Sequence, residues 1–238
     1  MWLEAADYRQ YLRRMIRKGL VKEGLRKMKT VYIYLQDSLA DWEAGYAIAE
    51  LHSGRFFKKT AQRLTVKACA LSMKPITTMG GLKIIPELTV DEICLSEAAL
   101  LLLPGGNTWL EPQHGPVIEK AAAFLTAGVP VAAICGATFA LGRAGLLNHQ
   151  KHTSNDLAFL RQVGGEAYTG EKLYQHRGAV RDGNLITASG TAPLEFAYQI
   201  IELLGVFAPD TLNFWYQLHK EKQPESFYQL MASLPAGE

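Results

Sequence analysis

The sequence has few cysteines, no long apolar run and no phosphate-binding glycine loop. Its three cysteines, Cys69, Cys94 and Cys135, are far apart and form no CxxC pair. This pattern argues against a disulfide scaffold and favours a reduced compartment. No apolar segment approaches the length of a membrane-spanning helix, and no signal-peptide centre is present. Neither a G-x-x-x-x-G-K-[ST] loop nor a convincing dinucleotide fingerprint occurs. We therefore expect a cytoplasmic protein that binds no cofactor and no membrane.

The charged content of 20% is ordinary, but the charges are unevenly distributed. Residues 1–28 carry eight basic and three acidic side chains, a balance of +5, so the formal net charge of +2 leaves −3 on the remaining chain. An acidic body argues against nucleic-acid binding by the domain itself. The basic segment is either an arm for an anionic partner or a leader from a misassigned start codon. We favour the second hypothesis for residues 1–27, because Met28 leads directly into a strand-like run and Lys22-Glu23-Gly24 is what a purine-rich bacterial ribosome-binding site would encode.

From residue 28 onward, strand-like and helix-like segments alternate. Strands are predicted at 31–35, 64–70, 99–103 and 131–134, with hairpins near 80–86 and 182–188. Helices are predicted at 41–51, 115–127, 137–144 and 191–204, and from about 210. Short apolar strands between helices indicate a mostly parallel sheet covered on both faces. We expect one α/β domain over residues 28–238, a three-layer sandwich that includes a C-terminal helix.

The most informative segment is the apolar run 131–134 and the Cys135-Gly136-Ala137-Thr138 that follows it. A strand that turns sharply into a helix leaves the side chain at the turn exposed, as in a nucleophile elbow. The helix N-terminus favours the reactive thiolate. A buried structural cysteine is the alternative. We predict that Cys135 is a nucleophile.

A second turn, Pro104-Gly105-Gly106, ends the preceding apolar strand. Parallel sheets place ligands beyond the carboxyl ends of their strands, so this turn and Cys135 are expected to lie together. The amides of Gly106 and Gly136 are then placed to stabilise an oxyanion, whereas the alternative is a tight turn whose glycines serve backbone geometry alone. Trp109, close after Gly106, is expected to wall an apolar pocket.

These segments together resemble the DJ-1/PfpI family of the class I glutamine amidotransferase-like superfamily, over about residues 28–205. The resemblance rests on four motifs: Leu102-Leu103-Pro104-Gly105-Gly106, Ala132-Ala133-Ile134-Cys135-Gly136-Ala137, Ala144-Gly145-Leu146-Leu147 and Ile186-Thr187-Ala188-Ser189-Gly190-Thr191. It implies a flavodoxin-like sandwich, usually dimeric, with Cys135 as the elbow cysteine. Similar folds serve as amidases, peptidases, glyoxalase-like or deglycating enzymes, isonitrile hydratases, chaperones and redox sensors.

The chain departs from the family pattern at several positions. Gly136 replaces the histidine that follows the cysteine of PfpI-type peptidases, and Glu195 lacks the histidine of amidotransferase triads, so neither activity is expected. The family's glutamate after the first strand aligns with Ala40. Asp41 is the predicted substitute, as in isonitrile hydratase-like members, although an Asp before a helical run is also a preferred N-cap. Glu43 is interpreted as a residue that interacts with the helix dipole from the first turn, or as a surface group.

A cysteine nucleophile usually needs a base. His152 is the predicted histidine partner, although the register puts Asn155 at the position where many relatives carry a histidine. The alternative is that His152, like His176, is a surface histidine. His149 and His152 are only two possible ligands without a carboxylate cluster, so no metal site is expected.

We therefore predict a cysteine-dependent hydrolase or lyase that acts on a small carbonyl or amide compound. Cys135 attacks as thiolate, Asp41 or His152 moves the proton, and Thr138 or Asn155 orients the substrate. The alternative is a stress- or redox-responsive protein whose Cys135 oxidises reversibly without a dedicated substrate. A structural or chaperone-like dimer ranks third. The expected partners are a small-molecule substrate and a second copy of the chain.

Overall fold

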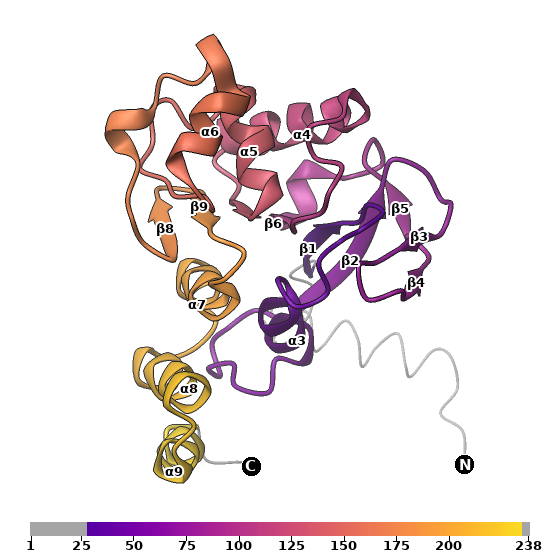
Figure 1. Ribbon diagram of the computed structural model, residues 1–238. Coiled ribbons are helices and arrows are strands. Elements are labelled where there is room, and N and C mark those ends of the chain that lie inside the picture. Colours follow the sequence, from indigo (N-terminus) through magenta and orange to yellow (C-terminus); the bar gives the residue numbers. More distant parts are fainter. Residues whose placement is uncertain (1–27, 235–238) are drawn as a thin grey trace, which may run out of the picture.

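A seven-stranded sheet forms the centre of the computed structural model, which describes residues 28–234 (Figure 1). The strand order is β5-β2-β1-β6-β7-β9-β8, and only the β8–β9 pair is antiparallel. The strands are β1 (Lys29–Tyr34), β2 (Leu64–Ala70), β5 (Leu88–Thr89), β6 (Ala98–Leu103), β7 (Val131–Ile134), β8 (Ala179–Asp182) and β9 (Leu185–Ala188). The predicted flavodoxin-like α/β architecture is confirmed. The basic extension, residues 1–27, lies outside the described residues.

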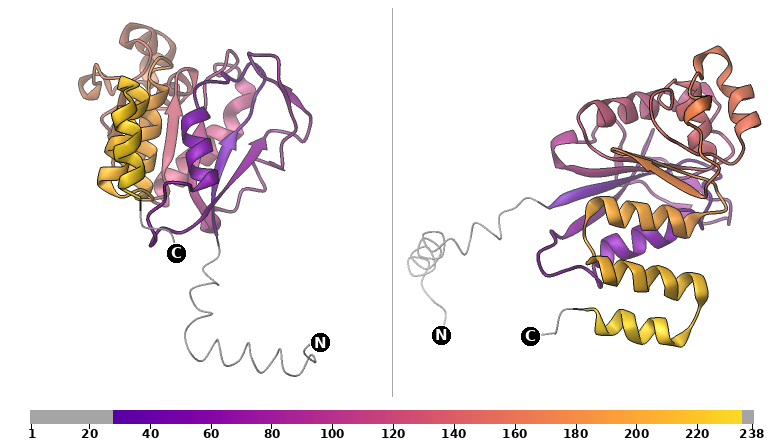
Figure 2. Two further views of the ribbon diagram at one scale, coloured as in Figure 1. Left: turned by 90° about the horizontal axis from the view of Figure 1, so that it is seen from below. Right: turned by 90° about the vertical axis from the view of Figure 1, so that its left-hand side faces the viewer.

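Helices cover both faces of this sheet (Figure 1). One face carries α4 (Gly115–Thr126), α5 (Gly136–Arg143) and α6 (Leu157–Gly164), and the other carries α3 (Gly45–Ser53) and α7 (Pro193–Leu204). Further from the sheet, α8 (Pro209–Glu221) packs on α7 and α9 (Pro224–Ala232) packs on α8 (Figure 2). Alternate strand residues enter the two cores: Leu100 and Leu102 face α3 and α7, whereas Leu101 and Leu103 face the other layer. None of these helices is long and apolar enough to cross a bilayer.

The local patterns predicted most strands well and some helices poorly. The strands at 64–70 and 131–134 have the predicted bounds, and both hairpins form, the first as β3 (Ile76–Thr77) and β4 (Lys83–Ile84). The C-terminal segment forms two helices rather than one, because Lys222 adopts a left-handed conformation before Pro224 starts α9. The helix predicted at 41–51 begins only at Gly45, and α6 was not predicted.

The parallel strands bring four loops to one edge of the sheet. Cys135 follows β7, Gly105 follows β6, Gly190 follows β9, and Glu43 lies in the loop after β1. This carboxyl edge is where open α/β sheets place their ligands. The candidate site is assembled from these loops.

Candidate active site

Cys135 occupies the sharp strand-to-helix turn that the sequence predicts. Its φ of 57° and ψ of −124° lie in a region that residues other than glycine rarely adopt. Two backbone hydrogen bonds fix the turn: the Cys135 N–H donates to the carbonyl of Ala188 (2.9 Å), and the Thr138 N–H donates to the carbonyl of Cys135 (3.0 Å). The half-buried thiol is therefore held at the sheet edge by a conformation that the surrounding structure imposes.

Glu43 supplies a buried carboxylate beside this thiol. The side chain is 1% exposed, and its Oε2 accepts a hydrogen bond from the Gly105 N–H at 2.5 Å. Its Oε1 has no hydrogen-bond partner within residues 28–234, and the thiol of Cys135 interacts with the carboxyl group. Burial raises the pKa of Glu43, while the Gly105 amide and the thiol partly offset that increase.

Gly190 packs closely against the thiol on the β9 side. A Cβ added there would lie 2.9 Å from Sγ of Cys135 and 3.0 Å from Oε1 of Glu43, so only glycine fits. The Gly190 N–H donates to Oδ1 of Asn155 (2.8 Å), and its carbonyl accepts from Nε1 of Trp42 (3.2 Å). Trp42 is 53% exposed and forms part of the rim.

Asn155 completes the surroundings of the sulfur. Its Nδ2 donates to Sγ of Cys135 at 3.2 Å. The pKa of Cys135 is raised, mainly by burial and further by the charge of Glu43, and the N–H groups of Asn155 and Gly136 oppose that shift. The predicted lowering of the thiol pKa by the helix N-terminus is therefore outweighed. The pKa values of the thiol and of the Glu43 carboxyl are thus both raised, for both groups mainly by burial.

Asp41 does not lie at the thiol and does not cap a helix. Its Oδ2 accepts from the Gly80 N–H at 2.7 Å, and hydrogen bonding from Thr78 and Gly80 lowers its pKa. Because α3 begins later than predicted, residues 41–44 form a turn that directs Glu43 inward and Asp41 toward the β3–β4 hairpin. The carboxylate beside Cys135 is thus Glu43, and its interpretation as a surface group was wrong. The clue was its place between the buried residues Ala40 and Ala44.

His152 is also unavailable to the thiol. The ring is fully buried, with Nδ1 2.7 Å from the carbonyl of Gln150 and Nε2 2.7 Å from the Tyr168 hydroxyl. Burial lowers the pKa of His152, which keeps the ring neutral. Both ring nitrogens are hydrogen-bonded, so His152 connects its loop to Tyr168. Asn155 is the residue of this loop that lies beside Cys135. His152 is therefore neither the predicted base nor a surface histidine.

The other predicted residues divide between the site and its support. Gly136 donates its N–H toward the thiolate, and a Cβ there would lie 2.9 Å from the carbonyl of Gly106, so the two glycines adjoin. Thr138 is fully buried; its hydroxyl donates to the Cys135 carbonyl and lies 2.6 Å from Oγ of Ser154. Thr138 therefore braces the elbow and does not face a substrate.

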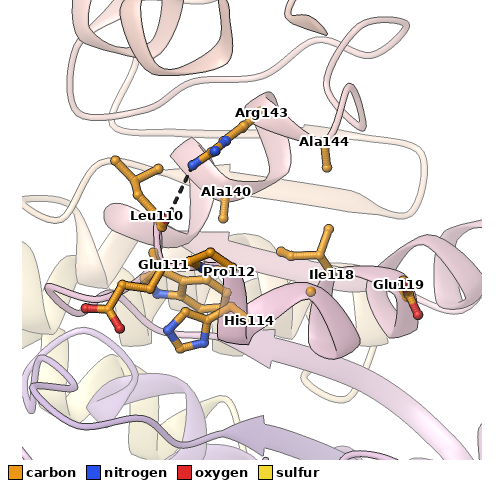
Figure 3. Close-up of a pocket in the computed structure, with 11 residues that line it drawn as sticks. Leu110, Glu111, Pro112, His114, Ile118, Glu119, Ala140, Arg143 and Ala144 are labelled. Carbon is orange, nitrogen blue, oxygen red and sulfur yellow. Dashed lines mark hydrogen bonds between the residues drawn. The ribbon is translucent and has the colours of Figure 1, made fainter.

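Trp109 is buried beside Gly136. Its Nε1 donates to the carbonyl of Pro104 (2.8 Å). The ring does line a cavity of about 370 Å³ between α4 and α5, but Cys135 is not part of that cavity (Figure 3). Within the described chain, no group of three His, Cys, Asp or Glu side chains is arranged to hold a metal ion.

Comparison with known proteins agrees with this architecture. Residues 29–203 match the DJ-1/PfpI family. A Bacillus subtilis (strain 168) protein named "Uncharacterized protease YoaZ" is 48% identical, over 87% of this chain and 98% of the relative. A crystal structure of a thiJ/pfpI family protein from Bacillus anthracis superimposes with a TM-score of 0.83 at 48% identity, covering 87% and 98% of the two chains. A DJ-1 superfamily protein from Agrobacterium tumefaciens gives 0.72 at 31% identity, covering 82% and 99%.

Proposed function

The chain belongs to the DJ-1/PfpI family, and on that premise we propose that it is a cysteine-dependent hydrolase or lyase acting on a small carbonyl or amide compound. The observation that carries the proposal is the pairing of the Cys135 thiol with the buried carboxylate of Glu43. A buried acid–base group within reach of a nucleophile is the arrangement that covalent catalysis requires. Glu43 takes the role predicted for Asp41.

The chemistry begins with transfer of the thiol proton from Cys135 to Glu43. The sulfur forms a bond to the carbonyl carbon, and the C=O π pair moves onto oxygen, where the amides of Gly106 and Gly136 stabilise it. With an amide substrate, the C=O bond re-forms, the C–N bond breaks, and the leaving nitrogen takes the proton from Glu43. Water then hydrolyses the thioester and restores the thiol. With an aldehyde, the first adduct is a hemithioacetal.

The test is a screen of aldehydes, amides and isonitriles with the full chain and three variants. Cys135→Ser and Glu43→Gln should each lower turnover by about 100-fold or more, since a positioned proton-transfer group typically contributes 10²–10⁴. Asp41→Asn is the matched control and should retain turnover. Mass spectrometry should find the substrate-derived adduct on Cys135 in the wild-type protein. Turnover that survives Cys135→Ser would refute the proposal.

Two other functions are outcomes of the same screen. Peptide substrates belong in the panel because the Bacillus subtilis relative is named a protease, although Gly136 offers no histidine after the cysteine. Reversible oxidation of Cys135 without turnover of any compound would favour the redox-responsive alternative. Homodimer formation is a further proposal, which light scattering of the purified chain tests directly.

A further inference from the structure

A second cavity, of about 410 Å³, lies where β1, β2 and β6 end. Its lining comes from the segments that follow these strands and includes Gln36, Lys74, Thr108 and His114. In the sheet, β1 lies between β2 and β6. The strands that follow β1 in the sequence are added first on its β2 side and then on its β6 side. This is the position at which open parallel sheets accept ligands. Cys135 does not line this cavity, so it is separate from the thiol site.

An ordered chain of buried hydrogen bonds leads into this cavity. Oγ1 of Thr108 donates to Oε1 of Gln36 (2.6 Å) and therefore accepts from Nε2 of His114 (3.0 Å). Nδ1 of a neutral His114 then accepts from the Tyr34 hydroxyl (2.8 Å). Burial lowers the pKa of His114 and raises that of Tyr34, which favours these protonation states. If His114 instead donated from Nδ1 to the Tyr34 oxygen, the buried hydroxyl proton of Tyr34 would have no acceptor in the described chain.

The chain of hydrogen bonds ends on an unused donor. Gln36 is 4% exposed, and its Nε2 has no hydrogen-bond partner among residues 28–234. A buried donor without an acceptor destabilises the folded chain. Because Oε1 is already fixed by Thr108, the amide cannot turn away without losing that bond. The Nε2 group lies at the wall of the cavity beside Gly106, where a Cβ would come within 3.0 Å of it, and an acceptor atom that reaches this wall would satisfy it.

The charges around the cavity restrict that acceptor. Asp37 and Glu111 line it with two carboxylates against the single ammonium of Lys74, while His114 is neutral. This balance disfavours a carboxylate or phosphate ligand, because a second negative charge would be brought beside two others. An uncharged carbonyl oxygen meets the need of the Gln36 amide without that repulsion. The volume is within the range of small-molecule sites.

We propose that this cavity is a second binding site, for a small uncharged compound whose carbonyl oxygen accepts a hydrogen bond from Nε2 of Gln36. Gly106 separates the two sites: a Cβ on Gly106 would lie 2.9 Å from Cδ of Gln36, and its carbonyl adjoins Gly136. Binding here is non-covalent and does not depend on thiol chemistry. The inference therefore stands or falls separately from the proposed function.

Benzamide, with benzoate as its charged counterpart, is a suitable probe in a chemical-shift titration of the ¹⁵N-labelled full chain. Benzamide should shift the amide signals of Gln36, Thr108 and His114, with the same Kd in Cys135→Ser, and benzoate should bind more weakly. Gln36→Met should raise the Kd about tenfold, which corresponds to the loss of one buried hydrogen bond. Gln113→Met is the matched control, because Gln113 also lines the cavity but its Nε2 already donates to Glu111 (2.7 Å).

Gln36→Glu provides a second variant that keeps the acceptor for Thr108 and removes the donor, should the methionine variant fail to fold. It too should weaken benzamide binding. The proposal is overturned if benzamide causes no saturable shifts, which would mean that water alone occupies the cavity. It is also overturned if Cys135→Ser abolishes binding, or if both Gln36 variants bind as tightly as the wild-type chain.

Discussion

The carboxylate of Glu43 and the thiol of Cys135 meet at the carboxyl edge of the sheet, although the two residues belong to loops after different strands. The charge of Glu43 raises the cost of ionising the thiol, because two negative charges would then lie close together in a buried place. The thiol, as a hydrogen-bond donor, lowers the cost of ionising Glu43. The Gly105 amide fixes the carboxylate. The same pairing that holds the thiol protonated at rest provides the acceptor for its proton during attack.

This relationship predicts that Glu43→Gln makes Cys135 more reactive toward iodoacetamide while lowering turnover. Removing the negative charge lowers the pKa of the thiol, so a larger fraction is thiolate at neutral pH. The measurement is the alkylation rate as a function of pH. Asp41→Asn should leave that profile unchanged, because Asp41 binds Gly80. A profile displaced toward higher pH by Glu43→Gln would contradict the prediction.

Asn155→Ala should have the opposite effect on the thiol. The Nδ2 group stabilises the thiolate, so its loss raises the pKa of Cys135 and slows alkylation at neutral pH. We expect the alkylation profile to move to higher pH. Asn184→Ala serves as the control, since Asn184 bonds the Gly128 carbonyl away from the thiol. Equal alkylation rates in the two variants would show that Asn155 does not stabilise the thiolate of Cys135.

Gly190→Ala should reduce turnover without unfolding the domain. Its Cβ would enter the space between Cys135 and Glu43, at 2.9 and 3.0 Å from their Sγ and Oε1 atoms. We expect a loss of about 100-fold, the order of effect that follows a displaced reacting group. Gly115→Ala is the control, because nothing lies within 4 Å of a Cβ added there. Wild-type turnover in Gly190→Ala would show that the thiol and carboxylate need not meet.

The elbow was predictable because its signal is local. The run 131–134 is apolar, and Cys135 is followed directly by small residues and a helical pattern. A local signal for α6 was also present, since Asp156 caps this helix by accepting from the Phe159 N–H (2.7 Å).

Asn155 was predicted near Cys135, but the carboxylate partner and the position of His152 were not predictable in the same way, because they depend on distant segments. Asp41 and Glu43 are both carboxylates near the start of one helix, and the sequence alone does not say which turns inward. The choice is made by Gly80, in a hairpin far along the chain, which binds Asp41. His152 is likewise kept from the thiol by Tyr168, whose hydroxyl forms a hydrogen bond with Nε2 of His152.

Cys135→Gly should be more stable than Cys135→Ala. The positive φ of residue 135 costs a side-chain-bearing residue free energy that glycine does not incur. After allowing for the greater freedom of an unfolded glycine, we expect a difference of about 1 kcal/mol in the free energy of unfolding. Urea denaturation of the two variants measures it. Equal stabilities would show that the turn holds no strain.

Glu43→Gln should stabilise the domain at neutral pH and lose that advantage in acid. The folded pKa of Glu43 lies above the unfolded value of 4.5, so the folded state binds more protons than the unfolded state between the two values. The contribution of Glu43 to stability is therefore complete below 4.5 and is lost as the pH rises through the raised pKa. Glutamine keeps an acceptor for the Gly105 N–H and carries no charge to bury. We expect a gain of about 1 kcal/mol at pH 7, measured by urea denaturation. Asp41→Asn should show no such gain, because the pKa of Asp41 is lowered and its charge stabilises the folded chain.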